Sequence, residues 1–219
     1  MKFYIISPPE NNINFSPKNL DLISKIINVE YFQFRPKFSD IQKKISFVGK
    51  YFSEIKQICK KNKTKLIIND DFEIAKKFVF DGIHLGQYDK DCIEAKKKFG
   101  RKFHVGVSCG ASIVSAKKAQ NDGANYVAFG PAFKSKTKNK KKISLNNLIK
   151  KRMEISLPFT IIGGINHKNF IKLRELRPDY VAIINSLWNF KAGPIESAKL
   201  FKKLMFIGDL NHENQCKLT

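Results

Sequence analysis

Hydroxyl and lysine side chains alternate in one short segment of the chain, directly after an apolar run and a Gly-Pro pair. The segment GPAFKSKTKNKKK, residues 130–142, contains Ser135, Lys136, Thr137 and Lys138. Hydroxyls and backbone amides donate hydrogen bonds to phosphate oxygens, and ammonium groups neutralise their charge. A tail that needed only charge would not need hydroxyls. The spacing therefore favours a phosphate-binding loop over the other reading of a lysine run, a solvated surface loop.

Further unusual polar residues and glycines also follow short apolar runs. They are Gln33, Arg35 and Lys37; Asn69, Asp70 and Asp71; Gln87 and Asp89; Ser108; Gly163 and Gly164; and Asn185 and Ser186. Asp70 and Asp89 form a carboxylate pair suited to Mg²⁺, which takes few protein ligands and keeps substrate phosphates and water. Together with the cations and hydroxyls, this pair describes a diphosphate site. The Gly-Gly pair and the last turn offer backbone N–H groups for a monophosphate.

The elements that must position these residues recur regularly. Eight short, β-rich runs are expected to form strands, at residues 2–7, 30–35, 65–70, 82–87, 103–108, 125–131, 159–165 and 179–186. Helical patterns lie between them, including residues 72–80, 112–123, 167–176 and a closing helix at 193–206. Near-continuous apolar strands alternating with helices predict a single-domain α/β protein, a (β/α)8 TIM barrel, with a doubly wound sheet as the alternative. We expect the barrel to span 1–207 and a polar tail to follow at 208–219.

In such a barrel the carboxyl ends of the strands converge on one mouth, where barrel enzymes hold their sites. Each residue also has a purely structural interpretation. Asp70 or Asp71 could cap the helix at 72–80, Asp89 and Ser108 could cap the helices that follow them, and His84 is better explained as a satisfied core residue. The glycines could only allow a tight turn, and Arg35 could pair with a carboxylate on the rim. The joint occurrence of all of them at strand ends favours a site.

Composition limits the other classes of protein. The 219 residues are 42% hydrophobic, with 19 Phe, which is enough for a sizeable core. The net charge of +22 invites a nucleic-acid role, but the basic residues are nearly all lysines spread along the whole chain, so we expect no nucleic-acid partner. No apolar stretch is long enough for a membrane span. The apolar segment at the N-terminus is too short for a secretory signal. Four unpatterned cysteines indicate free thiols and a cytoplasmic location, and nothing indicates a zinc site.

At this point the motifs resemble a known family, thiamine-phosphate synthase. They are QFRPK (33–37), INDDFEIA (68–75), DGIHLGQYD (81–89), VGVS (105–108), GANYVAFGPAFKSKTK (123–138), IIGGI (161–165) and VAIINS (181–186). The resemblance covers nearly the whole chain. It implies a transferase that joins hydroxymethylpyrimidine diphosphate to thiazole phosphate and releases pyrophosphate. It also implies a dissociative mechanism, in which the diphosphate leaves before the thiazole nitrogen captures a pyrimidine-methyl cation.

The resemblance also implies a role for each matched position. Residues 33–37 (with Gln33, Arg35 and Lys37) and Asn69 would hold the pyrimidine substrate, and Asp70 and Asp89 would bind Mg²⁺. Ser108 and Lys138 would contact the diphosphate. The thiazole phosphate would be held by Ser135, Lys136, Thr137, Gly164, Ile184 and Asn185, next to Gly163. Arg35, Ser108 and Lys138 are the expected catalytic residues, because they would stabilise charge on the leaving group.

Three positions depart from the family pattern. Lys134-Ser135 replaces Pro-Thr, Pro36 replaces a glutamate, and Asn185 replaces a hydroxyl residue. The rival interpretations are a thiazole tautomerase, a non-catalytic phosphate-ligand binder and a basic nucleic-acid-binding protein. Asp70, Asp89 and Lys138 argue against the tautomerase, which has no diphosphate to ionise. The sequence leaves a homo-oligomer open and gives no role to Lys140–Lys142.

Overall fold

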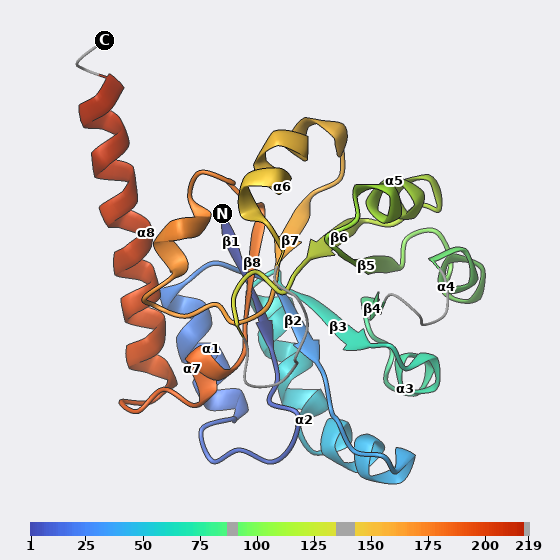
Figure 1. Ribbon diagram of the computed structural model, residues 1–219. Helices are drawn as coiled ribbons and strands as arrows, with labels where there is room; N and C mark the ends of the chain where they lie inside the picture. The colour runs from blue at the N-terminus through green and yellow to red at the C-terminus, as the bar shows by residue number, and fades with distance from the viewer. Residues whose placement is uncertain (87–91, 135–142, 217–219) are drawn as a thin grey trace.

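In the computed structural model, eight parallel strands pair in chain order and close into a barrel. The structure describes residues 1–86, 92–134 and 143–216, with side chains described up to residue 206 except at Arg152. Figure 1 shows the strands at the centre with helices around them. The strands are β1 (Lys2–Ile6), β2 (Val29–Phe34), β3 (Lys65–Asn69), β4 (Gly82–Leu85), β5 (His104–Gly110), β6 (Tyr126–Phe129), β7 (Phe159–Ile161) and β8 (Tyr180–Ile183). The predicted (β/α)8 fold is confirmed, and the closed sheet excludes the doubly wound alternative.

The side chains of each strand alternate between the barrel interior and the layer of helices. Along β1, Phe3 and Ile5 belong to the large core between strands and helices, whereas Tyr4 and Ile6 belong to a second cluster. This inner cluster consists of Tyr4, Ile6, Tyr31, Ile67, Tyr126 and Ala182. Its tyrosines fill the interior and at the same time bring in hydroxyl groups that need hydrogen-bond partners.

The helices follow the strands along the chain and surround the barrel. They are α1 (Pro17–Ile26), α2 (Ile41–Lys61), α3 (Phe72–Phe78), α4 (Cys92–Phe99), α5 (Ile113–Asn121), α6 (Leu145–Lys151), α7 (Asn185–Trp188) and α8 (Pro194–Cys216), with 3-10 turns at Arg152–Glu154 and Phe170–Leu173. The closing helix begins at Pro194 as expected and lies beside α1 (Figure 1). It continues past residue 207, and the domain boundary proposed there stays a prediction.

Two local expectations are wrong. The helix predicted at 167–176 is only the 3-10 turn Phe170–Leu173, because the side chains of Asn166 and Asn169 bond nearby backbone amides and compete with helical bonds. Val79, which lies inside the helix predicted at 72–80, is not helical and is 68% exposed. The helix ends at Phe78, and Val79 adopts a left-handed conformation with a φ of 53° that turns its side chain outward.

The remaining expectations about the chain as a whole concern membranes and thiols. Within the described ranges, no helix is both long and apolar enough to cross a membrane. Cys59, Cys92 and Cys109 are buried free thiols. Burial raises the pKa of Cys109 to about 12, so this thiol stays protonated and unreactive at neutral pH.

His104, at the start of β5, links the fold to pH. Its Nδ1 is buried without a hydrogen-bond partner among the described residues. Burial lowers its pKa below the ordinary 6.5, and Lys65 and Lys96 lower it further. The unfolded chain therefore binds a proton below about pH 6.5 that the folded chain resists, so stability is lost as the pH falls from there through the lower folded pKa.

We expect His104→Gln to lose less stability than the wild type between pH 7.5 and pH 5.5, because glutamine takes up no proton in the unfolded state. Urea unfolding at the two pH values measures the difference for each protein. The same loss of stability in both proteins would show that His104 does not contribute to the pH dependence.

Candidate active site

The described candidate residues all lie at, or directly after, the carboxyl ends of barrel strands. Arg35 follows β2, Asn69 ends β3, and Asp70 comes next. Ser108 is near the end of β5, Gly163 and Gly164 follow β7, and Ile184 and Asn185 follow β8. Because all strands are parallel in one closed barrel, these positions share one mouth. The expectation that separate motifs converge is therefore met for this part of the set.

Asp70 is held in place by its neighbours on β3 and β4. Its backbone amide donates to the carbonyl of His84 at 2.9 Å. The amide of Gly86 donates to Asp70 Oδ1 at 2.9 Å, and the side chain of Asn69 donates to Oδ2. A φ of 60° lets the residue turn its carboxylate toward β4. These bonds fix the carboxylate at the mouth of the barrel.

Asp71, rather than Asp70, caps α3. Its Oδ1 accepts a hydrogen bond from the amide of Ile74 at 3.0 Å, and its Oδ2 lies 3.6 Å from the ammonium of Lys44. The sequence left open which of the two carboxylates caps the helix. Because Asp71 caps α3, helix capping does not account for the aspartate at position 70.

Arg35 and Lys37 add positive charge beside this carboxylate. The amide of Arg35 donates to Ser7 Oγ at 2.9 Å, which sets the turn after β2. Burial lowers the pKa of the half-buried guanidinium, while the charge of Asp70 opposes that shift. Lys37 is exposed, and its amide donates to the carbonyl of Pro9 at 2.8 Å. An arginine starts from so high a pKa that it stays charged here.

A cavity of about 500 Å³ opens between the β2 and β3 ends. This volume lies in the range of small-molecule sites. Lys37, Asn69 and Asp70 line it together, whereas Gln33, Arg35 and Ser108 are not part of its wall. The full lining is Pro36, Lys37, Phe38, Ser39, Lys44, Asn69, Asp70, Asp71, Phe72 and Glu73.

A chain of hydrogen bonds joins Gln33 to Ser108 through the barrel interior. Gln33 Nε2 donates to the hydroxyl of Tyr4 at 2.9 Å, and this hydroxyl lies 2.8 Å from that of Tyr126. The Tyr126 hydroxyl lies 3.1 Å from Nδ1 of His84, and Nε2 of His84 lies 2.9 Å from Ser108 Oγ. His84 is thus a satisfied interior residue, as predicted. Ser108 does not cap α5, because Ser112 Oγ accepts from the amide of Ser115 at 3.1 Å.

Sequence analysis missed Tyr4 and Tyr126, the two central members of this chain. Both stand at inward positions of apolar strands, where they look like ordinary core aromatics. The signal that could have found them is Gly106 on the intervening strand β5. A Cβ at Gly106 would lie 2.0 Å from Cζ of Tyr126, so only glycine leaves room for the tyrosine ring there.

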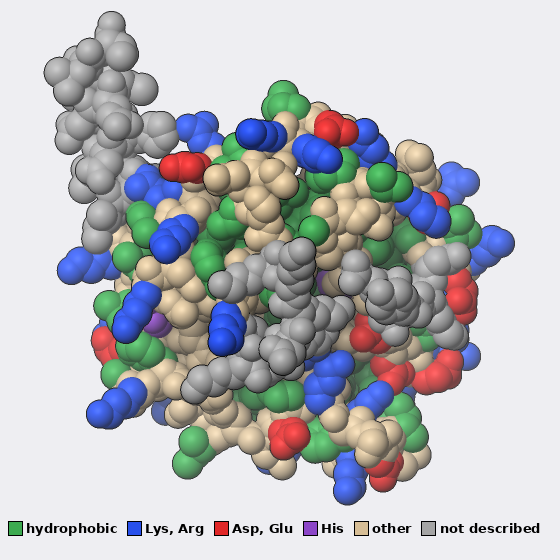
Figure 2. All heavy atoms as spheres, viewed as in Figure 1, with side chains coloured by type: hydrophobic (Ala, Val, Ile, Leu, Met, Phe, Trp, Pro, Cys, Tyr) green, Lys and Arg blue, Asp and Glu red, His purple; other side chains and the backbone are tan. Residues whose placement is uncertain are grey.

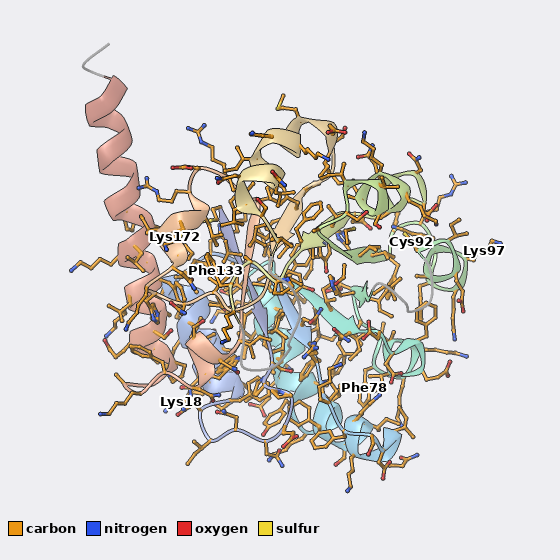
Figure 3. The ribbon with its side chains drawn as sticks, viewed as in Figure 1. Lys18, Phe78, Cys92, Lys97, Phe133 and Lys172 are labelled. Atoms are coloured by element: carbon orange, nitrogen blue, oxygen red, sulfur yellow. The ribbon has the colours of Figure 1, made fainter. Side chains whose placement is uncertain are left out.

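The Gly-Gly pair after β7 holds the start of the loop that follows β6. Gly163 and Gly164 have φ angles of 93° and 68°, and a Cβ at Gly164 would lie 2.6 Å from the carbonyl oxygen of Lys134. The amide of Phe133 donates to the carbonyl of Gly163 at 3.0 Å. Figure 3 shows Phe133 near the centre of the view. The entrance to the predicted phosphate loop is therefore fixed against β7.

The turn after β8 leads directly into α7. The carbonyl of Ile184 accepts from the amides of Leu187 and Trp188, each at 3.0 Å. The indole Nε1 of Trp188 donates to the carbonyl of Ile6 at 2.8 Å, which anchors this turn to the end of β1. The first amides of a helix have no partner inside it, so Asn185 and its neighbour can offer N–H groups to an anion.

Several predicted site residues lie outside the described residues: Asp89, Ser135, Lys136, Thr137 and Lys138, together with Gln87 and Lys140–Lys142. Among the residues that the structure does describe, no three His, Cys, Asp or Glu side chains gather as a metal cluster. A site built from Asp70 and Asp89 is therefore not tested by the geometry.

Comparisons with known proteins place the chain in a family. A family model for thiamine monophosphate synthase matches residues 3–187. A thiamine-phosphate synthase of Pelagibacter ubique is 42% identical over 202 residues, which are 91% of this chain and 95% of that protein. Another, from Nitrosospira multiformis, is 36% identical over 162 residues, 72% of this chain and 69% of its own length.

Solved structures agree on the fold. Thiamine phosphate pyrophosphorylase from Pyrococcus furiosus superposes with a TM-score of 0.77 at 21% identity, over 93% of this chain and 94% of that one. The protein of the same name from Bacteroides thetaiotaomicron gives a TM-score of 0.64 at 18% identity, over 96% and 98%. With the barrel, the mouth and the sequence match over most of its length, the chain belongs to the thiamine monophosphate synthase family.

Proposed function

We propose that this chain is a thiamine-phosphate synthase, which condenses hydroxymethylpyrimidine diphosphate with thiazole phosphate and releases pyrophosphate. The family membership, which extends over nearly the whole barrel, is the observation that carries the proposal. The mouth fits it, because the Asp70 carboxylate is fixed there while Asp71 caps the neighbouring helix. On the face of the molecule that Figure 2 shows, Lys and Arg side chains are scattered with acidic ones among them, which does not favour a nucleic-acid surface.

Each predicted residue keeps its proposed role. Gln33, Arg35, Lys37 and Asn69 hold the pyrimidine substrate, and Ser108 and Lys138 bind its diphosphate. The thiazole phosphate is held by Ser135, Lys136, Thr137, Gly163, Gly164, Ile184 and Asn185. The support is their placement at strand ends, as far as the structure describes them.

The donors at the end of β3 fit a magnesium ion. The carboxylate of Asp70, which accepts hydrogen bonds from Gly86 and Asn69, supplies oxygen atoms of the kind that Mg²⁺ prefers as ligands. Asp89 follows β4, the neighbouring strand, and would be the second ligand. Bound to these residues and to substrate oxygens, Mg²⁺ would neutralise the charge of the leaving diphosphate.

The chain's own contribution is to hold charges and donors where negative charge grows on the leaving group. The backbone of Arg35 is held by Ser7 Oγ, and the hydroxyl of Ser108 is held by His84, before the substrate arrives. Groups fixed in this way stabilise the transition state, in which negative charge grows on the leaving diphosphate, more than they stabilise the bound substrate. No nucleophile or strong base is required, in agreement with a mouth built from cations, hydroxyls and amides.

We also propose that the enzyme works in the cytoplasm, and that residues 1–207 form its catalytic domain. The buried free thiols of the described cysteines support a reducing environment.

The direct test mixes the two phosphorylated precursors with the protein and Mg²⁺ and follows thiamine phosphate and pyrophosphate by chromatography. We expect both products in equal amounts, and no turnover in excess EDTA, because the diphosphate would then meet the carboxylates without neutralisation. Full activity in EDTA would refute the metal site. Binding of both precursors without any product would favour a non-catalytic binder.

The two neighbouring aspartates form a matched pair for mutation. Asp70→Asn tolerates the left-handed backbone and still accepts from Gly86, and a turn of the Asn69 amide lets its oxygen accept from the new NH2 group. We therefore expect near-normal stability but a kcat lower by ~10²-fold or more. Asp71→Ala removes the cap and should lower the free energy of unfolding by about 1 kcal/mol. Its kcat should stay within a few-fold of wild type. Steady-state kinetics and urea unfolding of both variants measure this contrast, and equal kcat values would rule out a special role for Asp70.

A further inference from the structure

The hydrogen-bond chain in the barrel interior connects the two ends of one proposed substrate site. It runs from Gln33 on β2 through Tyr4, Tyr126 and His84 to Ser108 on β5. Gln33 and Tyr4 are each 2% exposed, Tyr126 is fully buried, and His84 is 8% exposed. In the proposed function Gln33 faces the pyrimidine and Ser108 faces the diphosphate. The interior therefore links the recognition of two different parts of one molecule.

Counting donors and acceptors gives this chain a direction. Gln33 Nε2 is a donor to Tyr4. If Tyr4 then donates to Tyr126, Tyr126 can donate to Nδ1 of His84. The ring then carries its hydrogen on Nε2 and donates to Ser108 Oγ. In this arrangement both tyrosine hydroxyls and the ring hydrogen of His84 have acceptors, as buried polar groups require, and the Ser108 hydroxyl hydrogen is left for a ligand.

The opposite arrangement leaves a defect while the amide of Gln33 keeps its orientation. With the hydrogen of His84 on Nδ1, Tyr126 would have to donate to Tyr4. Tyr4 would then accept from both Gln33 and Tyr126, and its own hydrogen would have no acceptor among the described residues. A buried donor without a partner loses its hydrogen bonds to water and gains none in the protein, which destabilises this arrangement. Only a flip of the Gln33 amide would remove this defect, so the two ends of the chain are coupled.

The strands are built to let this chain form. His84, Gly106 and Tyr126 pair in register across β4, β5 and β6. Because Gly106 has no side chain, the ring of Tyr126 passes over β5 and stacks on His84, with centroids 5.7 Å apart. Burial raises the pKa of Tyr126 and of Tyr4 well above the ordinary value. Both phenols therefore keep their hydrogens at neutral pH.

Resting on the proposed function, we propose that Tyr4, Tyr126 and His84 are positioning residues that fix the hydrogen-bonding polarity of the substrate site. Ser108 accepts from His84, so its own hydrogen points to an anionic diphosphate oxygen. Gln33 turns its amino group to Tyr4, so its carbonyl oxygen faces the amino-bearing edge of the pyrimidine. The hydrogen-bond chain thus holds Gln33 and Ser108 in the orientations that one substrate molecule needs.

The first test reads the direction of the chain without any substrate. Ring-nitrogen NMR, assigned with His84→Gln, should show hydrogen on Nε2 and a bare Nδ1 for His84 in the wild type. Tyr126→Phe removes the donor to Nδ1 and should shift His84 toward the other tautomer. Tyr31→Phe is the matched control, because Tyr31 packs 4.7 Å from the ring of Tyr126 but is outside the chain. Hydrogen on Nδ1 in the wild type, or no change in Tyr126→Phe, would overturn the direction.

The second test measures the coupling between the two ends in turnover. Gln33→Leu and Ser108→Ala, alone and together, are compared for kcat/KM in three backgrounds: wild type, Tyr126→Phe and Tyr31→Phe. The coupling is the factor by which kcat/KM of the double variant departs from the product of the two single effects. We expect this factor to fall by about 3-fold or more in Tyr126→Phe and to persist in Tyr31→Phe. Any coupling carried by the substrate itself survives in all backgrounds.

The outcomes separate this inference from the proposed function. Equal coupling in all three backgrounds would refute the positioning role while leaving the synthase assignment intact. A wild type without turnover would refute the synthase assignment, and with it the role at the substrate, whereas the NMR result would still decide the direction of the chain.

Discussion

Closing the sheet into a barrel imposes the constraint on which the rest of the structure depends. Half of the side chains on each strand must then share a narrow interior without access to bulk water. In this chain that space holds tyrosines as well as aliphatic residues, so their hydroxyls have to bond to one another or to neighbouring polar side chains. The interior is thus a polar network as well as a packed core, and it ends at the mouth.

Folding and recognition use different layers of the same strands. The outward side chains, such as Phe3, Ile5 and Phe32, pack against the helices and hold the barrel together. The described polar candidates at the strand ends, such as Asn69 and Asp70, are not part of that core. Asp70 and Asp71 show how close the two roles can come, because adjacent carboxylates serve the mouth and a helix cap. A residue type alone therefore does not reveal its role here; the direction of its side chain does.

The sequence predicted the strands and three of the helices, α3, α5 and α8, because apolar runs and cap residues are local signals. It also predicted that the polar residues meet at one mouth, which follows from parallel strands alone. It could not decide between Asp70 and Asp71, since both stand where a cap is expected. It missed Tyr4 and Tyr126 because an inward tyrosine in an apolar strand reads as core. The 167–176 helix failed because asparagine side chains captured the amides there. The hydrogen-bond network of the barrel interior remained hidden because it depends on contacts between strands far apart in the chain.

Gly106 and Tyr126 occupy a single volume in the barrel, because the tyrosine ring fills the place where a side chain at 106 would stand. The two positions therefore cannot vary independently. A larger residue at 106 is admissible only where 126 carries a much smaller one, and that exchange would cut the link between β4 and β6. In a redesign of this barrel, the sizes of the residues at 106 and 126 must be chosen together. An aromatic ring placed like that of Tyr126 requires glycine at 106.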